Sequence, residues 1–149
     1  MNRFESVAEP FQMVDNDMRL ELLLEYSDKL PPLPEEYEPM RDAGLNMVHE
    51  CQSPVFLHVD VEDDTVHLYA DVPREAPTAR AFVSILIEAF DGATPDEVAG
   101  APSDALRQLG LNGLLGMQRT RGLSAIYQRV KNEVERKALS NGEAASESA

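Results

Sequence analysis

Cysteine is nearly absent from this sequence, because Cys51 is the only one in 149 residues. A single cysteine cannot form an internal disulfide bond. Long apolar runs are also missing, since the longest, around Ala81 to Ile87, is too short to cross a bilayer. The N-terminal residues MNRFESVAEP lack the apolar core of a signal peptide. We therefore expect a cytoplasmic protein without a membrane segment.

Positive charge is scarce as well. The chain has 13 Lys and Arg against 27 Asp and Glu, which gives a formal net charge of −14. A chain this acidic repels phosphate backbones and anionic lipids, which makes nucleic acid and membrane surfaces poor partners. A partner protein with a basic patch is more compatible with this negative charge than nucleic acid or a membrane surface. Neither a P-loop nor a dinucleotide-binding fingerprint is present.

The clearest pattern that is present is a polar–apolar alternation on both sides of an acidic turn. Apolar residues recur at every second position over residues 55–61 and again over 66–72. Period two predicts a β-hairpin of these two strands with one buried face. If residues 63–64 form the turn, Asp60 lies opposite His67 and the apolar residues share one face.

Helical periodicity and capping residues predict helices on either side of this hairpin. Thr94 and Glu97 form a capping box around Pro95, which marks a helix start. The prolines in LPPLPEEYEPMRDAG favour an extended connection over residues 30–44, and Pro10 leaves residues 1–14 without an assignment. The predicted helices run from Asp15 to Lys29, Pro77 to Phe90, Pro95 to Gly100, Ser103 to Leu109 and Arg121 to Leu139.

These elements predict an α+β fold, in which a small antiparallel sheet packs against several helices. The sheet has room for a third short strand beside the hairpin. We expect one domain over residues 1–139. The last residues, 140–149, are small and polar and predict a disordered tail.

Cys51 has two interpretations. Free cysteine is often a small buried hydrophobe. However, Cys51 lies among Glu50, Gln52, Ser53 and Pro54, a polar and turn-prone set, and loops carry chemistry more often than cores do. A reactive thiol is therefore the alternative to a structural one.

The histidines do not indicate a metal site. His49, His58 and His67 match no compact zinc spacing, and only one thiol is available. His58 and His67 fall on the polar face of the predicted hairpin, so we interpret them as solvated. No metal and no cofactor are expected on this chain.

Arg119 and Arg121 stand at the start of the last helix, where the helix dipole prefers anions. One interpretation is that they pair with some of the many carboxylates. The other is a small electropositive site on an acidic protein, because local rules tend to be broken where function requires it.

Four blocks of the sequence, in order across residues 17–130, resemble the SufE-type sulfur acceptors, accessory proteins of Fe–S cluster assembly. The cysteine block departs from the family at Glu50, where glycine is usual, and at Phe56, where tryptophan is usual. The blocks are Leu30-Pro31-Pro32-Leu33-Pro34-Glu35, Asn46-x-Val48-x-x-Cys51-Gln52-Ser53-x-Val55-Phe56-Leu57, Thr94-Pro95-Asp96-Glu97-Val98, and Leu109-Gly110-Leu111 followed by Arg119-x-x-Gly122-Leu123-x-Ala125-Ile126.

The resemblance implies a sulfur carrier rather than a stand-alone enzyme. A PLP-dependent cysteine desulfurase of the SufS type would donate a persulfide sulfur to Cys51. The carrier would stimulate this enzyme, and an Fe–S scaffold would receive the sulfur from the carrier. It also implies that Gln52, Ser53 and Arg119 support the sulfur site or dock the partner. A lone cysteine suits a carrier and excludes a scaffold, which needs several thiolates.

Two alternatives remain open. Glu50 beside the thiol is compatible with a rhodanese-type sulfurtransferase as the donor. A protein of a different class, a non-catalytic acidic binding module with a structural cysteine, would also have this composition.

Overall fold

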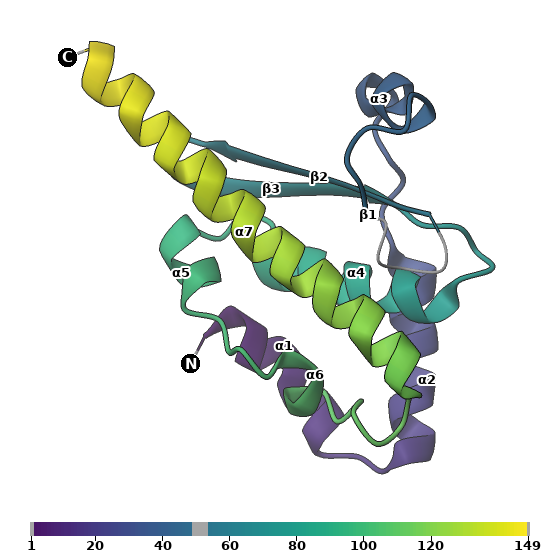
Figure 1. Ribbon diagram of the computed structural model, residues 1–149. Helices are drawn as coiled ribbons and strands as arrows, with labels where there is room; N and C mark the ends of the chain where they lie inside the picture. The colour runs from purple at the N-terminus through teal and green to yellow at the C-terminus, as the bar shows by residue number, and fades with distance from the viewer. Residues whose placement is uncertain (1, 49–53, 149) are drawn as a thin grey trace.

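The computed structural model describes residues 2–48 and 54–148, and their side chains as far as Asn141. It is an α+β fold, as predicted (Figure 1). Within these residues no helix is both long and apolar enough to cross a membrane. The elements are α1 (Arg3–Gln12), α2 (Asn16–Lys29), η1 (Glu35–Tyr37), α3 (Glu38–Asp42), β1 (Met47–Val48), β2 (Val55–Glu62), β3 (Thr65–Asp71), α4 (Pro77–Phe90), α5 (Pro95–Ala99), α6 (Ala105–Gln108) and α7 (Met117–Ser148).

The predicted hairpin is confirmed in its strands and in its register. β2 and β3 are antiparallel, and Asp60 pairs with His67 as expected. Asp63 and Asp64 have φ values of 52° and 61°, so both central residues of the turn are left-handed. This is the type I′ geometry that suits the right-handed twist of a hairpin. The third short strand is also present, since β1 pairs with β2 to give the order β1-β2-β3.

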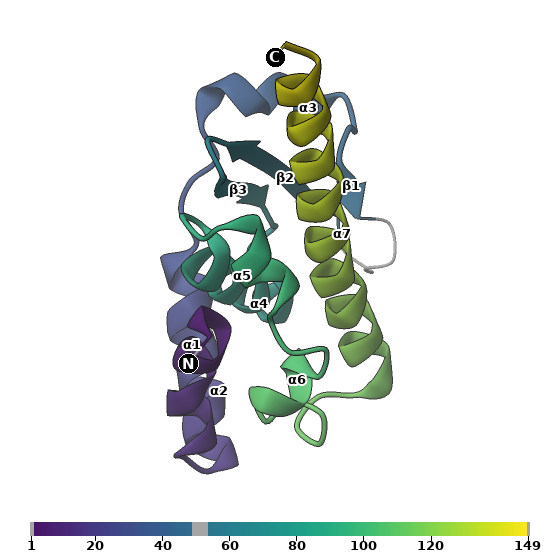
Figure 2. The same cartoon turned by 90° about the vertical axis from the view of Figure 1, so that its left-hand side faces the viewer.

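The core lies between the inner face of the sheet and helix α4. Ala81, Phe82 and Ile85 on α4 are fully buried, as the predicted apolar face requires. α2 packs along α4 on one side, and α7 runs diagonally across the molecule on another, as Figures 1 and 2 show. Because α4 contacts elements from both ends of the chain, it is the centre of the fold.

Helix α7 covers the edge of β2 that the short strand β1 leaves unpaired. Its buried residues include Ile126, Val130 and Val134. The side chain of Asn141 donates a hydrogen bond to the carbonyl of Val61 near the end of β2. The predicted start at 121 is four residues late, and the segment 140–148, predicted as a disordered tail, continues the helix.

Three other segments differ from the sequence analysis, which left residues 1–14 without an assignment. Residues 1–14 contain helix α1, which Asn2 caps and which includes Pro10. Pro10 lacks the N–H that would donate to the carbonyl of Ser6, and α1 ends two residues after it. Residues 35–42 are helical in η1 and α3, not extended. Helix α6 begins at Ala105, two residues after the predicted start at Ser103, and Asp104 precedes it.

The predicted caps of α2 and α5 are confirmed. The Asp15 carboxylate accepts from the backbone N–H of Met18 at 3.0 Å. Thr94 Oγ1 accepts from the backbone N–H of Glu97 at 3.2 Å. Each cap satisfies a backbone donor that the first helical turn leaves without an intrahelical partner.

Candidate functional site

The central predicted residues, Cys51, Gln52 and Ser53, lie outside the described residues, as does His49. What the structure describes is the framework on either side of them. Val48 ends β1 and Val55 begins β2, and these two residues are paired in the sheet. Both side chains are buried, with exposed fractions of 1% and 0%. The segment that carries the predicted thiol therefore joins two adjacent, firmly packed strand ends.

Arg119 lies in the first turn of α7, and its side chain is exposed. Arg121 is exposed as well. In the described parts of the chain neither arginine forms an ion pair with a carboxylate. The interpretation that acidic neighbours neutralise them has no support there, so both remain available to an acidic group of a partner.

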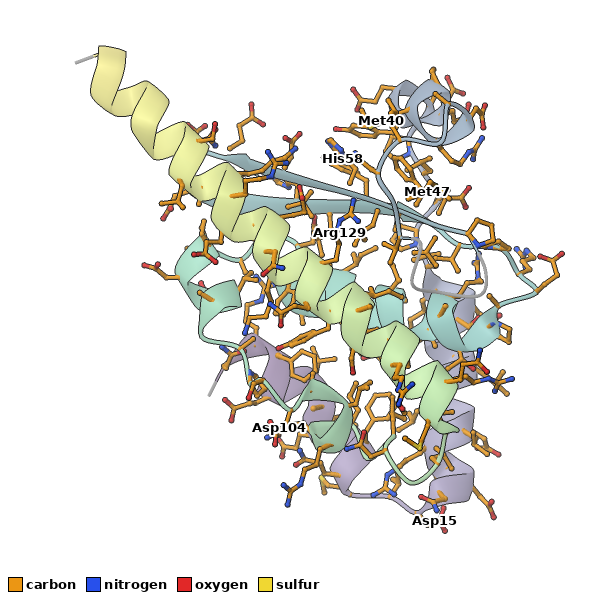
Figure 3. The ribbon with its side chains drawn as sticks, viewed as in Figure 1. Asp15, Met40, Met47, His58, Asp104 and Arg129 are labelled. Carbon is orange, nitrogen blue, oxygen red and sulfur yellow. The ribbon has the colours of Figure 1, made fainter. Side chains whose placement is uncertain are left out.

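The outer face of the hairpin, predicted to be solvated, is covered in part by residues 35–46. We call this segment the strap; it comprises η1, α3 and the turn before β1. The Tyr37 ring stacks on Tyr69 of β3 at a centroid distance of 4.6 Å and packs against the His58 ring of β2 at 4.8 Å. In Figure 3, Met40 of the strap and His58 lie on the same side of the sheet. The strap thus covers His58 and part of the second face of the sheet.

Electrostatic contacts also hold the strap in place. Arg41 Nη1 lies 2.8 Å from Asp71 Oδ2 at the end of β3. This ion pair is partly exposed, so it fixes geometry more than it adds stability.

Burial raises the pKa of Tyr37 to about 12, and the neighbouring Tyr69, Asp60 and Glu36 add to this shift. Tyr37 is therefore neutral at the surface of the hairpin.

His58 is buried, with 9% of its surface exposed, which corrects the prediction that it is solvated. The strap is the reason, because it lies over a strand position that the hairpin alone would leave open. Burial lowers the pKa of His58, and the positive charge of Lys137 lowers it further, whereas Asp60 and Glu133 oppose the shift. His58 is thus neutral at neutral pH. His67, on the same face, is half-buried and lies 3.8 Å from Asp91.

Asn46 connects the buried histidine to the start of β1. Its side-chain nitrogen lies 2.9 Å from His58 Nδ1 and 3.1 Å from the sulfur of Met40. Since the amide nitrogen can only donate, Nδ1 of His58 must accept, and the ring proton resides on Nε2. The carbonyl of Asn46 accepts from the backbone N–H of Leu57 at 3.1 Å. Asn46 is the last residue before β1, so these bonds fix where the strand begins.

The sequence reasoning missed this arrangement, although a signal was present. Phe56 and Tyr69 are large side chains on the face that was predicted to be solvated, and Phe56 is 1% exposed. Large aromatic side chains on both strands of one face indicate a covering element. The described residues hold no group of three or more His, Asp or Glu side chains that is arranged to bind a metal ion.

Comparison with known proteins agrees with the resemblance in the sequence. The chain matches the SufE family, described as an Fe-S metabolism associated domain, over residues 5–134. An uncharacterized SufE-like protein of Mycobacterium tuberculosis is 39% identical over 129 residues, which are 86% of this chain and 88% of the relative. An uncharacterized SufE-like protein of Synechocystis is 30% identical over 128 residues, 85% of this chain and 77% of the relative.

The fold is found in a solved structure as well. The solution structure of a hypothetical protein from Thermus thermophilus superimposes with a TM-score of 0.78 at 37% sequence identity. The match covers 92% of this chain and 96% of the other. The α+β arrangement described above is therefore common to related chains.

Proposed function

The chain belongs to the SufE family, which gives it a role in Fe–S metabolism, and from this premise we propose that it carries sulfur on Cys51. The donor is a PLP-dependent cysteine desulfurase, and the recipient is an Fe–S assembly scaffold. The observation that carries the proposal is the family match across residues 5–134 in a chain whose only thiol is Cys51.

The proposed step is a thiol–persulfide exchange. The Cys51 thiolate attacks the outer sulfur of the persulfide on the desulfurase. A new S–S bond forms at Cys51, the S–S bond on the desulfurase breaks, and the desulfurase cysteine leaves as a thiolate. The proton of the outer sulfur stays with it, so the product is Cys51–S–SH. Sulfur changes carrier without an external oxidant or reductant.

Two features of the described residues support this role. The strand ends Val48 and Val55 are buried and paired, so they give the Cys51 segment a rigid base. The exposed Arg119, without a carboxylate partner in the described ranges, suits an acidic group on the desulfurase. We propose that Arg119 docks the desulfurase or stabilises the anionic sulfur at Cys51.

Mass spectrometry tests the proposal directly. The wild-type protein is incubated with a cysteine desulfurase and cysteine, and its mass is then measured. We expect one added sulfur atom on Cys51, none in Cys51→Ser, and faster desulfurase turnover with the wild-type protein. Absence of added sulfur together with unchanged turnover would show that the proposal is wrong.

Further arms of the experiment separate the alternatives. Loading from thiosulfate and a rhodanese, without loading from the desulfurase, would indicate a different donor. Protection of Cys51 from iodoacetamide in both the isolated and the partner-bound protein would favour a structural cysteine. Arg119→Ala should weaken desulfurase stimulation, whereas Arg107→Ala, which removes an exposed arginine of α6, should not.

A further inference from the structure

The strap and β1 lead the chain directly into the Cys51 segment, and one side-chain pair joins the strap to the hairpin. We propose that Asn46 and His58 are positioning residues for Cys51. Their hydrogen bond holds the start of β1 in the one arrangement from which the Cys51 segment is presented to the sulfur donor. This inference rests on the function proposed above.

Asn46 is held in an uncommon backbone conformation. Its φ is 55°, in the left-handed region that residues other than glycine seldom adopt. Asparagine tolerates this region better than most side chains do. The side chain contacts His58 and Met40 while the carbonyl accepts from Leu57. An unfavourable backbone conformation persists where surrounding contacts hold it in place. Here contacts of the Asn46 side chain and of the Asn46 carbonyl both hold it.

His58 is a fixed acceptor for this bond. The ring is buried and packs against Tyr37 at 4.8 Å, so it has little room to turn away. Nδ1 accepts from Asn46 only while it carries no proton. His67 on the same hairpin face lies 3.8 Å from Asp91 and has no hydrogen bond to the strap among the described residues. Of these two hairpin histidines, His58 is therefore the one that positions Asn46.

β1 needs such a fixing point because it is very short. Among the residues before position 49 that the structure describes, Met47 and Val48 are the two of β1 that pair with β2. A strand of this length makes few backbone hydrogen bonds of its own, so its position depends on the buried Val48 side chain at one end and on the Asn46–His58 bond at the other. Without the Asn46–His58 bond, the strap and β1 would occupy the presenting arrangement for a smaller fraction of the time. The donor would then bind with an affinity reduced by that fraction, while the transfer step in the bound complex would be unchanged.

The test measures sulfur loading of Cys51 at varied concentrations of this protein with a fixed amount of cysteine desulfurase. Asn46→Ala and His58→Leu each remove the bond, from opposite sides. We expect each to raise KM for this protein by up to about fivefold, the limit set by one net hydrogen bond, with kcat retained. The double variant should be no worse than either single variant, because both remove the same interaction.

Conservative variants separate positioning from general damage to the fold. Asn46→Asp keeps the side-chain shape and offers an acceptor to which the other tautomer of His58 can donate. His58→Asn places an amide oxygen near the position of Nδ1. Both should load with a KM within about twofold of the wild-type value, because one hydrogen bond is restored. His67→Leu, a histidine change on the same hairpin face, should have no effect.

The outcomes distinguish this inference from the function on which it rests. A wild-type protein that takes up no sulfur overturns both. If the wild type is loaded and Asn46→Ala and His58→Leu behave like it, only the positioning role is overturned. A fall in kcat with KM unchanged, or conservative variants as impaired as Asn46→Ala, also overturns it.

Discussion

Replacing Tyr37 by alanine tests whether the strap is packed on the hairpin. The ring contacts Tyr69 at 4.6 Å and His58 at 4.8 Å. Each aromatic contact contributes about 0.5–1.5 kcal/mol beyond the burial of apolar area. Two contacts together give about 2 kcal/mol, so we expect Tyr37→Ala to lower the free energy of unfolding by about that amount.

Urea denaturation followed by circular dichroism measures this change. With an m value of about 2 kcal/mol per molar, the unfolding midpoint should fall by about 1 M. Tyr37→Phe is the matched control. It keeps both ring contacts and loses only a hydroxyl, so its midpoint should fall by about 0.5 M or less.

Two further measurements connect this loss of stability to the strap. A Tyr37→Ala/Tyr69→Ala double variant should lose less than the sum of the single losses, because the two rings share one contact. Amide exchange should be faster at Leu57, whose N–H is bonded to Asn46, than in the wild type. Equal midpoints for Tyr37→Ala, Tyr37→Phe and the wild type would refute the packing argument.

Two other predictions concern His58 and Gly110. The pKa of His58 is lowered in the folded protein, so the unfolded state binds more protons below its own pKa of about 6.5 and stability decreases as the pH falls through that range. His58→Asn should lose less stability than the wild type between about pH 7.5 and pH 5.5 in urea titrations, and equal losses would contradict this. Gly110 has a φ of 71°, and a Cβ there would lie 2.7 Å from Arg19 Nε, so Gly110→Ala should cost about 2 kcal/mol in thermal or urea unfolding. Gly44→Ala, at a φ of 78° with open space around it, should cost only the backbone part, about 1 kcal/mol; equal losses would exclude a role for Arg19.

The local sequence determined much of the scaffold. Polar–apolar alternation is a property of neighbouring residues, and it specified the strands, the turn at Asp63 and Asp64 and the register of the hairpin. Side-chain caps act within one helical turn, so Asp15 and Thr94 marked two helix starts correctly. The blocks around Cys51 likewise indicated the SufE family, which the family match confirms.

The tertiary structure decided which faces of these elements are covered. His58 belongs to a solvated face by alternation alone, and it is buried because the strap, distant in the sequence, folds over it. The left-handed conformation of Asn46 suits an asparagine, but the contacts that accompany it come from β2 and α3. The sequence alone thus specified the hairpin that follows Cys51. Only packing between separate segments decided how the start of β1 is held. Alternation and capping are patterns of neighbouring residues, whereas burial and hydrogen-bond partners are set by residues from other segments of the chain.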